Sequence, residues 1–318
     1  MSDVAFYCIS SELYFPGAVG LVNSVRMSGH TEAIHVLDCG LTETHRRLLE
    51  REVNVIPAPD ATPPYLLKTV APLRHPSEVM VLIDVDMVVA RSLRPLIDGA
   101  ADGVIAVKDN IDRFVPEWGE LLDLGTARPR PYVSSGLVVL GGPTGRRVLE
   151  LWDDRQRRVD YDASFFERDE RDYPFRYIDQ DVLNAILCTA VEPDRVTTLD
   201  PALAPVPPFR RIRPLGREGL RCVDAAGNEP YVIHQFVRKP WLEPMYHGIY
   251  SELLRRAWLS PSAPLRYPPE EIPLRMRTGL IARLERRRVD AFDLARWYVR
   301  DVIPDWIEGR RRRAGATR

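Results

Sequence analysis

Two aspartates, Asp84 and Asp86, follow an apolar run at 79–83, and their spacing suits the coordination of a metal ion. Side chains two positions apart on an extended chain point the same way, so both carboxylates would project to one point. Carboxylate oxygens at that spacing suit Mg²⁺ or Mn²⁺, and such ions bridge diphosphates. A polar strand end without a ligand is the alternative, because Asp-x-Asp recurs by chance in acidic chains.

A second polar group, Asp179, Gln180 and Asp181, stands at the start of an apolar helical pattern that contains Asn184. Acidic residues favour the N-terminal end of a helix, and an acidic N-cap accounts for one of the two aspartates. It does not account for the adjacent Gln or the downstream Asn. The group is therefore a candidate for contacts with a polar ligand.

Two further stretches could add hydroxyl and basic groups. Ser134 and Ser135 precede a Gly and an apolar strand pattern, and a turn entering a core strand explains them equally well. His234 ends a late apolar run and is followed by Lys239, one of only three lysines among 44 basic residues. A neutral imidazole can complete an oxygen-rich metal site, and Lys offers a point charge for phosphate, although a single His is more often structural.

These polar groups fall at the ends of predicted strands and helices. Short β-branched runs alternate with helical patterns through most of the chain. This alternation predicts an α/β fold with one mostly parallel sheet between helix layers, in which ligands bind at the carboxyl ends of the strands. Strands are predicted at 4–9, 34–37, 53–56, 79–83, 104–107, 133–140 and 231–234, and helices at 16–27, 42–51 and 178–187.

The composition is that of a soluble globular protein, with 45% hydrophobic and 28% charged residues in a chain of 318. Four cysteines lie far apart without a CxxC pair, which favours a reduced intracellular protein over a disulfide framework or a thiolate zinc site. The N-terminus lacks the basic and apolar regions of a signal peptide. No run reaches the ~20 apolar residues that span a bilayer.

The C-terminal part differs from the rest in charge. We predict a catalytic domain at 1–260, a Pro-rich linker at 261–273 and a basic helical tail at 274–318, which holds 13 Arg against 6 acidic residues. An amphipathic basic helix suits an anionic membrane surface, whereas docking on the catalytic body or on a dimer partner is the alternative. No nucleic-acid partner is expected. The apolar stripe of the predicted tail helix comprises Leu280, Leu284, Ala291, Leu294, Tyr298, Val302 and Trp306.

Four stretches, at 84–86, 132–139, 177–184 and 234–241, taken in this order, resemble the landmarks of retaining glycosyltransferases of the GT-A fold, family 8. This is the glycogenin and bacterial lipopolysaccharide galactosyltransferase group, and the resemblance spans 4–241. It implies a single Rossmann-like GT-A domain with Mn²⁺ or Mg²⁺ as cofactor. It also implies transfer of a sugar, with retention of configuration, from a UDP-sugar to a hydroxyl of a glycan, glycolipid or small-molecule acceptor.

The resemblance assigns roles at the metal site. Asp84 and Asp86 match the metal-diphosphate pair, with Asp84 also near the ribose, and His234 matches the third metal ligand. Lys239 would hold the diphosphate as it leaves. Because the spacing from His234 to Lys239 is one residue short of the family pattern, Arg238 could take that role instead.

The resemblance also assigns residues to the donor. Tyr14 resembles the Tyr that stacks on uracil, Ser11 replaces a usual polar residue of the same loop, and Lys68 stands where the family has an Arg. The transferred sugar would contact Ser134, which replaces an Asn of the family, and the two catalytic candidates, Asp179 and Gln180.

Two other functions remain open. The run at 81–88 superficially matches the first motif of haloacid-dehalogenase-type phosphohydrolases, although it lies far from the N-terminus and lacks the following Gly-Thr. The second alternative is a non-catalytic relative that binds nucleotide sugars. The loop with Ser11 and Tyr14, which departs from the family pattern for uridine binding, favours it. For the transferase we expect a cytoplasmic enzyme, attached peripherally to the inner face of the cell membrane if the tail binds lipid, or a homodimer if the tail binds a second copy.

Overall fold

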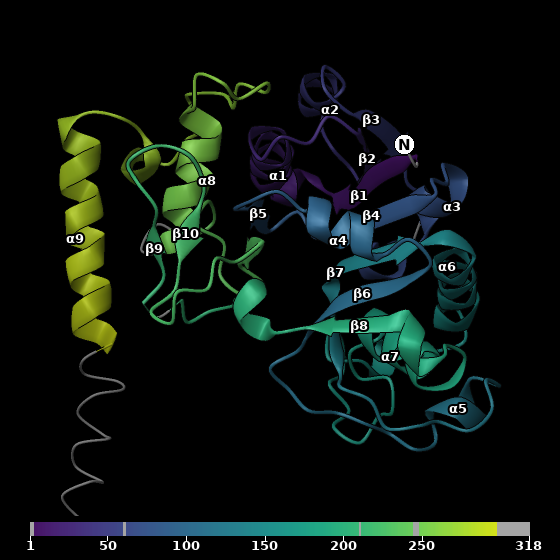
Figure 1. The fold of residues 1–318 in the computed structure, drawn as a ribbon. Coiled ribbons are helices and arrows are strands. Elements are labelled where there is room, and N and C mark those ends of the chain that lie inside the picture. Colours follow the sequence, from purple (N-terminus) through teal and green to yellow (C-terminus); the bar gives the residue numbers. More distant parts are fainter. Residues whose placement is uncertain (1–2, 60–61, 210, 244–247, 298–318) are drawn as a thin grey trace, which may run out of the picture.

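The computed structural model describes residues 3–59, 62–209, 211–243 and 248–297. A seven-stranded sheet forms its centre, in the order β3-β2-β1-β4-β7-β6-β8 (Figure 1). Neighbouring strands run parallel except that β7 is antiparallel to β4 and β6, which confirms the predicted α/β fold with a mostly parallel sheet. The strands are β1 (Val4–Ser10), β2 (Ala33–Asp38), β3 (Asn54–Pro57), β4 (Val79–Ile83), β6 (Gly103–Lys108), β7 (Val133–Gly141) and β8 (Val196–Leu199).

Helices cover both faces of this sheet, and two small antiparallel sheets lie beside it. The small sheets pair β5 (Met87–Val89) with β11 (Val232–His234) and β9 (Arg213–Pro214) with β10 (Cys222–Val223). The helices are α1 (Phe15–Met27), α2 (Glu43–Leu49), α3 (Val70–Arg74), α4 (Arg94–Gly99), α5 (Trp118–Leu121), α6 (Gly142–Gln156), α7 (Asp179–Thr189), α8 (Ile249–Leu259) and α9 (Leu280–Trp297).

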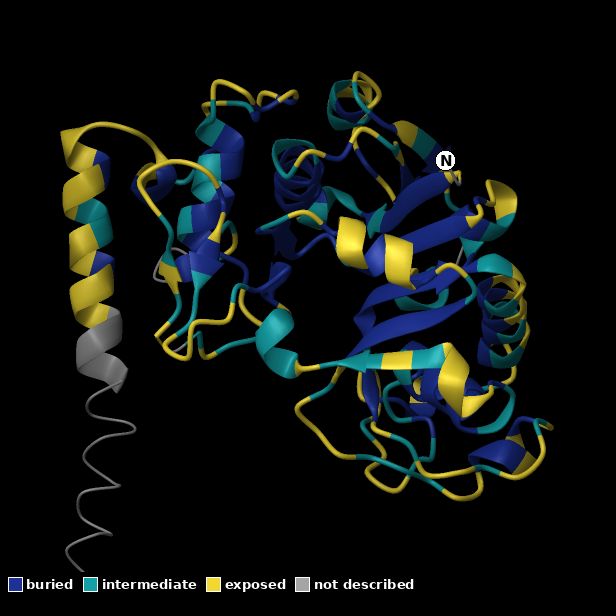
Figure 2. Ribbon diagram, viewed as in Figure 1, coloured by how far each residue is buried: buried dark blue, intermediate teal, exposed yellow. Residues whose placement is uncertain are grey.

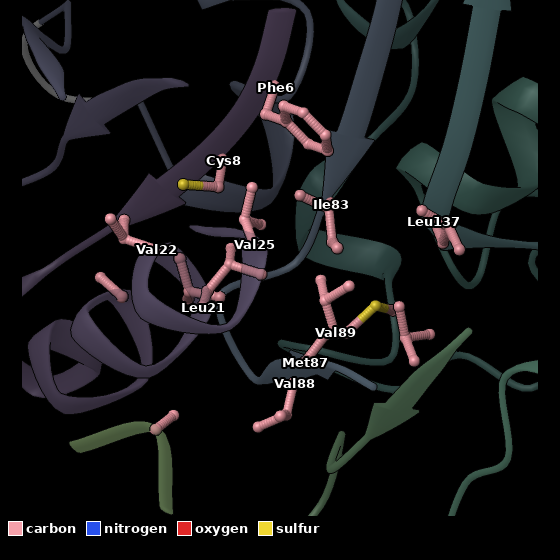
Figure 3. Packing of buried hydrophobic residues seen from close by; sticks show 14 of the residues in the cluster. Phe6, Cys8, Leu21, Val22, Val25, Ile83, Met87, Val88, Val89 and Leu137 are labelled. Carbon is pink, nitrogen blue, oxygen red and sulfur yellow. The ribbon is translucent and has the colours of Figure 1, made fainter. Parts of the chain in front are cut away.

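Apolar side chains of the sheet alternate between two hydrophobic cores, because successive residues of a strand point to opposite faces. On β1, Phe6 belongs to the core with α1 and α8, whereas Tyr7 belongs to the core with α3, α6 and α7. Figure 3 shows part of the first core, to which Cys8 of β1, Ile83 of β4 and Val25 of α1 belong. Coverage of both faces explains why β4 is apolar throughout.

The seven predicted strands and the helices predicted at 16–27, 42–51 and 178–187 are present, with ends within two residues of the prediction. Thr42 caps α2, since its side-chain oxygen accepts a hydrogen bond from the backbone N of His45 (3.4 Å). Strands β5, β8, β9 and β10 were not predicted, because they have only two to four residues and carry little periodicity. Among them β5 proves important for the site.

The segment 261–273, predicted as a Pro-rich linker, packs onto the body. Leu265 and Tyr267 are buried beside α1 and α8, and Tyr267 stacks on Trp258 with ring centroids 4.5 Å apart. Asn23 of α1 fixes the segment, because its Nδ2 donates to the carbonyl of Leu265 (2.9 Å) and its Oδ1 accepts from the N of Leu265 (3.0 Å). The division into domains at 260 and 274 stays a prediction.

Helix α9 stands apart from the sheet and is attached along one face (Figure 1). Ala282 and Val289 are buried on this face, and Arg286 donates from Nη1 to the carbonyl of Arg275 (2.6 Å). The opposite face is exposed (Figure 2), and it includes three residues of the predicted stripe, Leu280, Leu284 and Ala291. The side chain of Leu294 and all of Tyr298, Val302 and Trp306 lie outside the described residues. Within the described chain, no helix has the length and apolar character needed to cross a membrane.

Candidate active site

The segment Asp84-Val85-Asp86 forms a turn between β4 and β5 rather than a continuation of the strand. The backbone N of Asp84 donates to the carbonyl of Gly136 on β7 (2.9 Å), and the N of Met87 donates to the carbonyl of Asp84 (3.1 Å). A Cβ on Gly17 would lie 2.5 Å from the carbonyl oxygen of Val85, so α1 packs against this turn only because it carries glycine there. The turn therefore lies fixed at the carboxyl end of β4, where ligands bind in such sheets.

The pairing of β5 with β11 carries His234 to this turn. Met87 and His234 are opposite each other in the antiparallel register, and the N of Gln235 donates to the carbonyl of Asp86 (3.0 Å). As a result, ligand atoms of Asp84, Asp86 and His234 all lie within 4.8 Å of one another. The three predicted metal ligands are thus brought together, and two carboxylates with one imidazole can coordinate a divalent cation.

Two details of the geometry fit a cation at this cluster. Oδ1 of Asp86 is buried and has no aligned hydrogen-bond donor among the described residues, although Nε2 of His234 lies 3.3 Å away. A Cβ on Gly136 would come within 2.9 Å of Cε1 of His234 and 3.1 Å of Oδ2 of Asp84. Glycine at this position therefore leaves space between the ligands, and a buried carboxylate oxygen is available to coordinate a cation.

Lys239 is buried, with 3% of its surface exposed, and pairs with Asp86. Its Nζ lies 2.6 Å from Oδ2 of Asp86 and also donates to the carbonyl of Gln235. Burial alone would raise the pKa of Asp86, but the charges of the neighbouring His234 and Lys239, together with the hydrogen bond from Lys239, outweigh it, so this pKa is lowered. Asp86 is therefore a charged carboxylate with a lysine as its counter-ion.

Lys68 contacts the other aspartate and joins it to α7. Its Nζ lies 3.0 Å from Oδ1 of Asp84 and 3.1 Å from Oδ2 of Asp179, and it donates to Oγ of Ser135 (3.0 Å). Burial alone would lower the pKa of Lys68, but the charges of Asp179 and Asp84 outweigh it and raise this pKa. Lys68 is therefore a fixed cation that holds β4, β7 and α7 together at the site.

Asp179 and Gln180 open α7 and are held by β7 and β6. Oγ of Ser135 donates to Oδ2 of Asp179 (2.8 Å), and the N of Ser135 donates to Oε1 of Gln180 (3.1 Å). Nε2 of Gln180 donates to Oδ2 of Asp109 (3.1 Å), so both ends of the amide are engaged and its orientation is fixed. The sequence did not single out Ser135 or Asp109 for this role. The position of Asp109 directly after β6 is the signal that could have indicated it.

The predicted base-stacking residue also faces this cluster. The ring centroid of Tyr14 lies 5.6 Å from Nζ of Lys239, and the pKa of Tyr14 is raised by burial and by the charges of Asp86 and Asp84. Nε1 of Trp241 donates to the carbonyl of Leu13 (2.9 Å), which ties the loop after β1 to the loop that carries Lys239.

Three other predicted residues lie near the site with fewer contacts to it. The carbonyl of Ser11 accepts from the N of Tyr14 (2.9 Å), and Oγ of Ser134 accepts from the N of Gly136 (3.2 Å). Arg238 is exposed and lies 3.7 Å from Glu243, whereas its neighbour Lys239 is buried. The donor contacts of Ser11, Ser134 and Arg238 stay predictions.

Two polar residues of α7 hold the helix in place. Asn184 clamps Val133 of β7, because its Oδ1 accepts from the backbone N and its Nδ2 donates to the carbonyl, each at 2.8 Å. Asp181 is fully buried. It accepts hydrogen bonds from Nε of Arg113 (3.0 Å), the hydroxyl of Tyr132 (2.7 Å) and the backbone N of Tyr177 (2.8 Å). These contacts explain why the start of α7 is polar at buried positions.

No protein-family model and no curated protein matches this sequence. Among solved structures, the galactosyltransferase LgtC in complex with donor and acceptor sugar analogues is similar with a TM-score of 0.52 and 18% identity, covering 84% of this chain and 98% of that one. An active-site mutant of LgtC gives a TM-score of 0.51 and 17% identity, covering 78% and 94%. The bifunctional glycosyltransferase WbbM in its apo form gives a TM-score of 0.50 and 15% identity, covering 80% of this chain and 50% of that one.

At these identities the similarity concerns the fold. It extends over 84% of this chain, whose centre is the mostly parallel sheet, and over 98% of LgtC. The chain therefore has the GT-A fold of these glycosyltransferases, as the sequence motifs implied.

Proposed function

We propose that the protein is a glycosyltransferase that moves a sugar from a nucleoside diphosphate donor, UDP-sugar, to an acceptor hydroxyl, with Mn²⁺ or Mg²⁺ as cofactor. The observation that carries the proposal is the cluster of Asp84, Asp86 and His234 at the carboxyl end of β4 in this fold. The cation that these residues would hold offsets the charge on a leaving diphosphate.

Lys239 supplies a second positive charge to the leaving group. It neutralises Asp86 in this structure, at 2.6 Å, and lies beside the ring of Tyr14, the predicted base contact. With a cation held by Asp84, Asp86 and His234, the charge of Asp86 would be offset by the metal as well, and Lys239 would be available to pair with the diphosphate. Its burial supports this role over Arg238, because a charge in a desolvated site acts more strongly than one on the surface.

Asp179 and Gln180 position the sugar, and their contacts support retention by same-face attack. A double displacement needs a nucleophile beneath the sugar, and an amide is a weak one. The amide of Gln180 is also held at both ends by Ser135 and Asp109, while Asp179 is paired with Lys68. The acceptor hydroxyl would then attack from the face that the diphosphate leaves, and the leaving phosphate would take its proton.

The exposed face of α9 supports the predicted peripheral attachment to an anionic membrane. Leu280, Ile281, Leu284 and Phe292 are each about half exposed or more, and the tail from 274 carries an excess of Arg. Apolar side chains in an Arg-rich helix suit the headgroup region of anionic lipid.

A flotation assay tests this attachment. We expect the protein to float with liposomes containing phosphatidylglycerol but not with pure phosphatidylcholine, and the triple variant Leu280→Ser, Leu284→Ser, Phe292→Ser to remain unbound. Flotation of that variant to the same extent as the wild type would contradict a role for this face. Gel filtration of both proteins would show whether the face instead joins two copies.

Binding of nucleotides tests the proposed donor. We expect UDP and at least one UDP-sugar to raise the melting temperature of the protein in the presence of Mn²⁺, and to raise it much less in EDTA. Adenosine diphosphate serves as the control for the base, because Tyr14 and its loop are proposed to select uracil. A melting temperature that responds to none of these nucleotides with Mn²⁺ would contradict the proposal.

A further inference from the structure

Five aromatic side chains form a continuous group beside the candidate active site, and we name it the aromatic platform. The ring of Tyr65 stacks on that of Phe166, with centroids 4.4 Å apart, and on that of Tyr161, at 5.3 Å. Phe166 meets Phe165 edge to face at 5.7 Å, and Phe165 lies 5.9 Å from Tyr177. These rings come from two chain segments, at 65 and at 161–177.

The two phenylalanines of the platform are exposed although the backbone around them is fixed. Phe165 is 50% exposed and Phe166 is 45% exposed. The N of Phe165 donates to the carbonyl of Arg176 (2.8 Å), and the buried Ser164 accepts at its carbonyl from the N of Asp169 (2.8 Å). Leaving apolar surface in water costs about 25 cal/mol of free energy per Å². Two adjacent exposed rings on a loop that is fixed by hydrogen bonds therefore indicate a binding surface.

The platform is continuous with the site through both of its segments. Tyr65 lies in a short 3₁₀ helix (Pro64–Leu66) three residues before Lys68, which pairs with Asp84 and Asp179. Tyr177 lies two residues before Asp179, and its carbonyl accepts from the N of Gln180 (3.0 Å). A molecule lying on the rings would therefore reach toward the residues proposed to hold the transferred sugar.

Charged groups border the rings. The guanidinium of Arg176 lies 5.4 Å from the ring centroid of Phe165, and its Nε donates to Oδ1 of Asp169 (2.7 Å). The hydroxyl of Tyr161 donates to Oε1 of Glu167 (2.7 Å). Carboxylates and guanidinium groups can exchange hydrogen bonds with several hydroxyls at once. A surface built for an aliphatic chain would have no need of these groups next to the rings.

We propose that the aromatic platform binds a pyranose ring of the acceptor, so that the acceptor is a glycan or glycoside rather than a simple alcohol or a bare lipid. The face of an aromatic ring is negative, and it attracts the polarised C–H groups on the apolar face of a pyranose. The hydroxyls at the edge of that pyranose then meet Arg176, Asp169 and Glu167. The acceptor role rests on the proposed transferase function, whereas sugar binding itself does not.

Saturation-transfer NMR tests the platform without any donor. The probes are the methyl glycosides of glucose, galactose, mannose and N-acetylglucosamine. We expect at least one of them to receive saturation from the wild-type protein and to lose most of that signal with the double variant Phe165→Ala, Phe166→Ala. The matched control is Phe292→Ala, which removes a phenylalanine that is equally exposed, at 51%, on α9.

Donor binding separates the possible failures. Mn²⁺-dependent stabilisation by UDP should be unchanged in the double variant, because neither phenylalanine belongs to the cluster of Asp84, Asp86 and His234 or to the loop with Tyr14. If no glycoside binds the wild type, or if the double variant keeps the full signal, the platform is not a sugar site. If glycosides bind but no nucleotide sugar is turned over, the acceptor role is overturned together with the proposed function.

Discussion

Replacing Asp86 with asparagine will abolish metal-dependent binding of UDP and lower turnover of the donor by about a thousandfold or more. A metal ion stabilises the charge that develops on a leaving phosphate by several kcal/mol, and in the proposed function Asp86 would hold the cation through a carboxylate whose pKa its neighbours lower. Asparagine preserves the shape of the side chain but removes this charge. Calorimetric titration of UDP with Mn²⁺, followed by an assay of sugar release, would measure both effects.

The control for this prediction must separate binding from folding. Asp86→Asn leaves the buried Lys239 without its carboxylate, and a buried charge that loses its partner costs about 3–5 kcal/mol. In the double variant Asp86→Asn, Lys239→Met both charges are gone, so we expect most of the thermal stability to return while UDP binding stays lost. Undiminished Mn²⁺-dependent binding by either folded variant would contradict the role of Asp86.

Replacing Asp181 with alanine will lower the free energy of unfolding by about 3–5 kcal/mol, because the change breaks a buried ion pair and leaves its partners unsatisfied. Asp181 has no exposed surface and accepts hydrogen bonds from Arg113, Tyr132 and the backbone N of Tyr177. Urea denaturation would measure the loss. The matched control is Asp172→Ala, an exposed acid of the same segment, for which a change within about 0.5 kcal/mol is expected.

The same substitution will disturb the catalytic candidates that follow Tyr177. Ile178 enters α7 with a φ of 40°, which is strained for a β-branched residue and needs support from its surroundings. Asp181 gives part of that support through its bond to Tyr177. We expect Asp181→Asn, which keeps the shape and one acceptor, to lose less stability than Asp181→Ala. A loss below about 1 kcal/mol for the alanine variant would contradict this account.

The sheet and the pair of Asp84 and Asp86 were predictable because each depends on a local pattern. The apolar run at 79–83 fits a strand buried on both faces, and the aspartates after such a strand lie at its carboxyl end. His234 was identified by its place in a family-like order of motifs. The structure adds the reason that it reaches Asp86, namely the pairing of β5 with β11.

Other parts of the site depend on tertiary contacts that leave no periodic signal. Asp109 and Ser135 acquire a role only because β6 and β7 lie beside α7, where they hold Gln180 and Asp179. Strand β5 has three residues and reads in sequence as a continuation of β4. We predicted that Asp84 and Asp86 point the same way because they lie on an extended strand. This reason was wrong, since residues 84–86 form a turn. A turn can bring two carboxylates together equally well, which is why the predicted pairing still holds.

Sugar release from a nucleotide donor tests the central proposal most directly. Incubated with a panel of UDP-sugars and Mn²⁺, the wild-type protein should release UDP and free sugar from at least one of them, and Asp86→Asn should not. Binding of UDP-sugar without release, even with glycosides present as acceptors, would point to a non-catalytic relative. Release of phosphate from simple phosphomonoesters, with no action on any nucleotide sugar, would contradict the transferase and favour a phosphohydrolase.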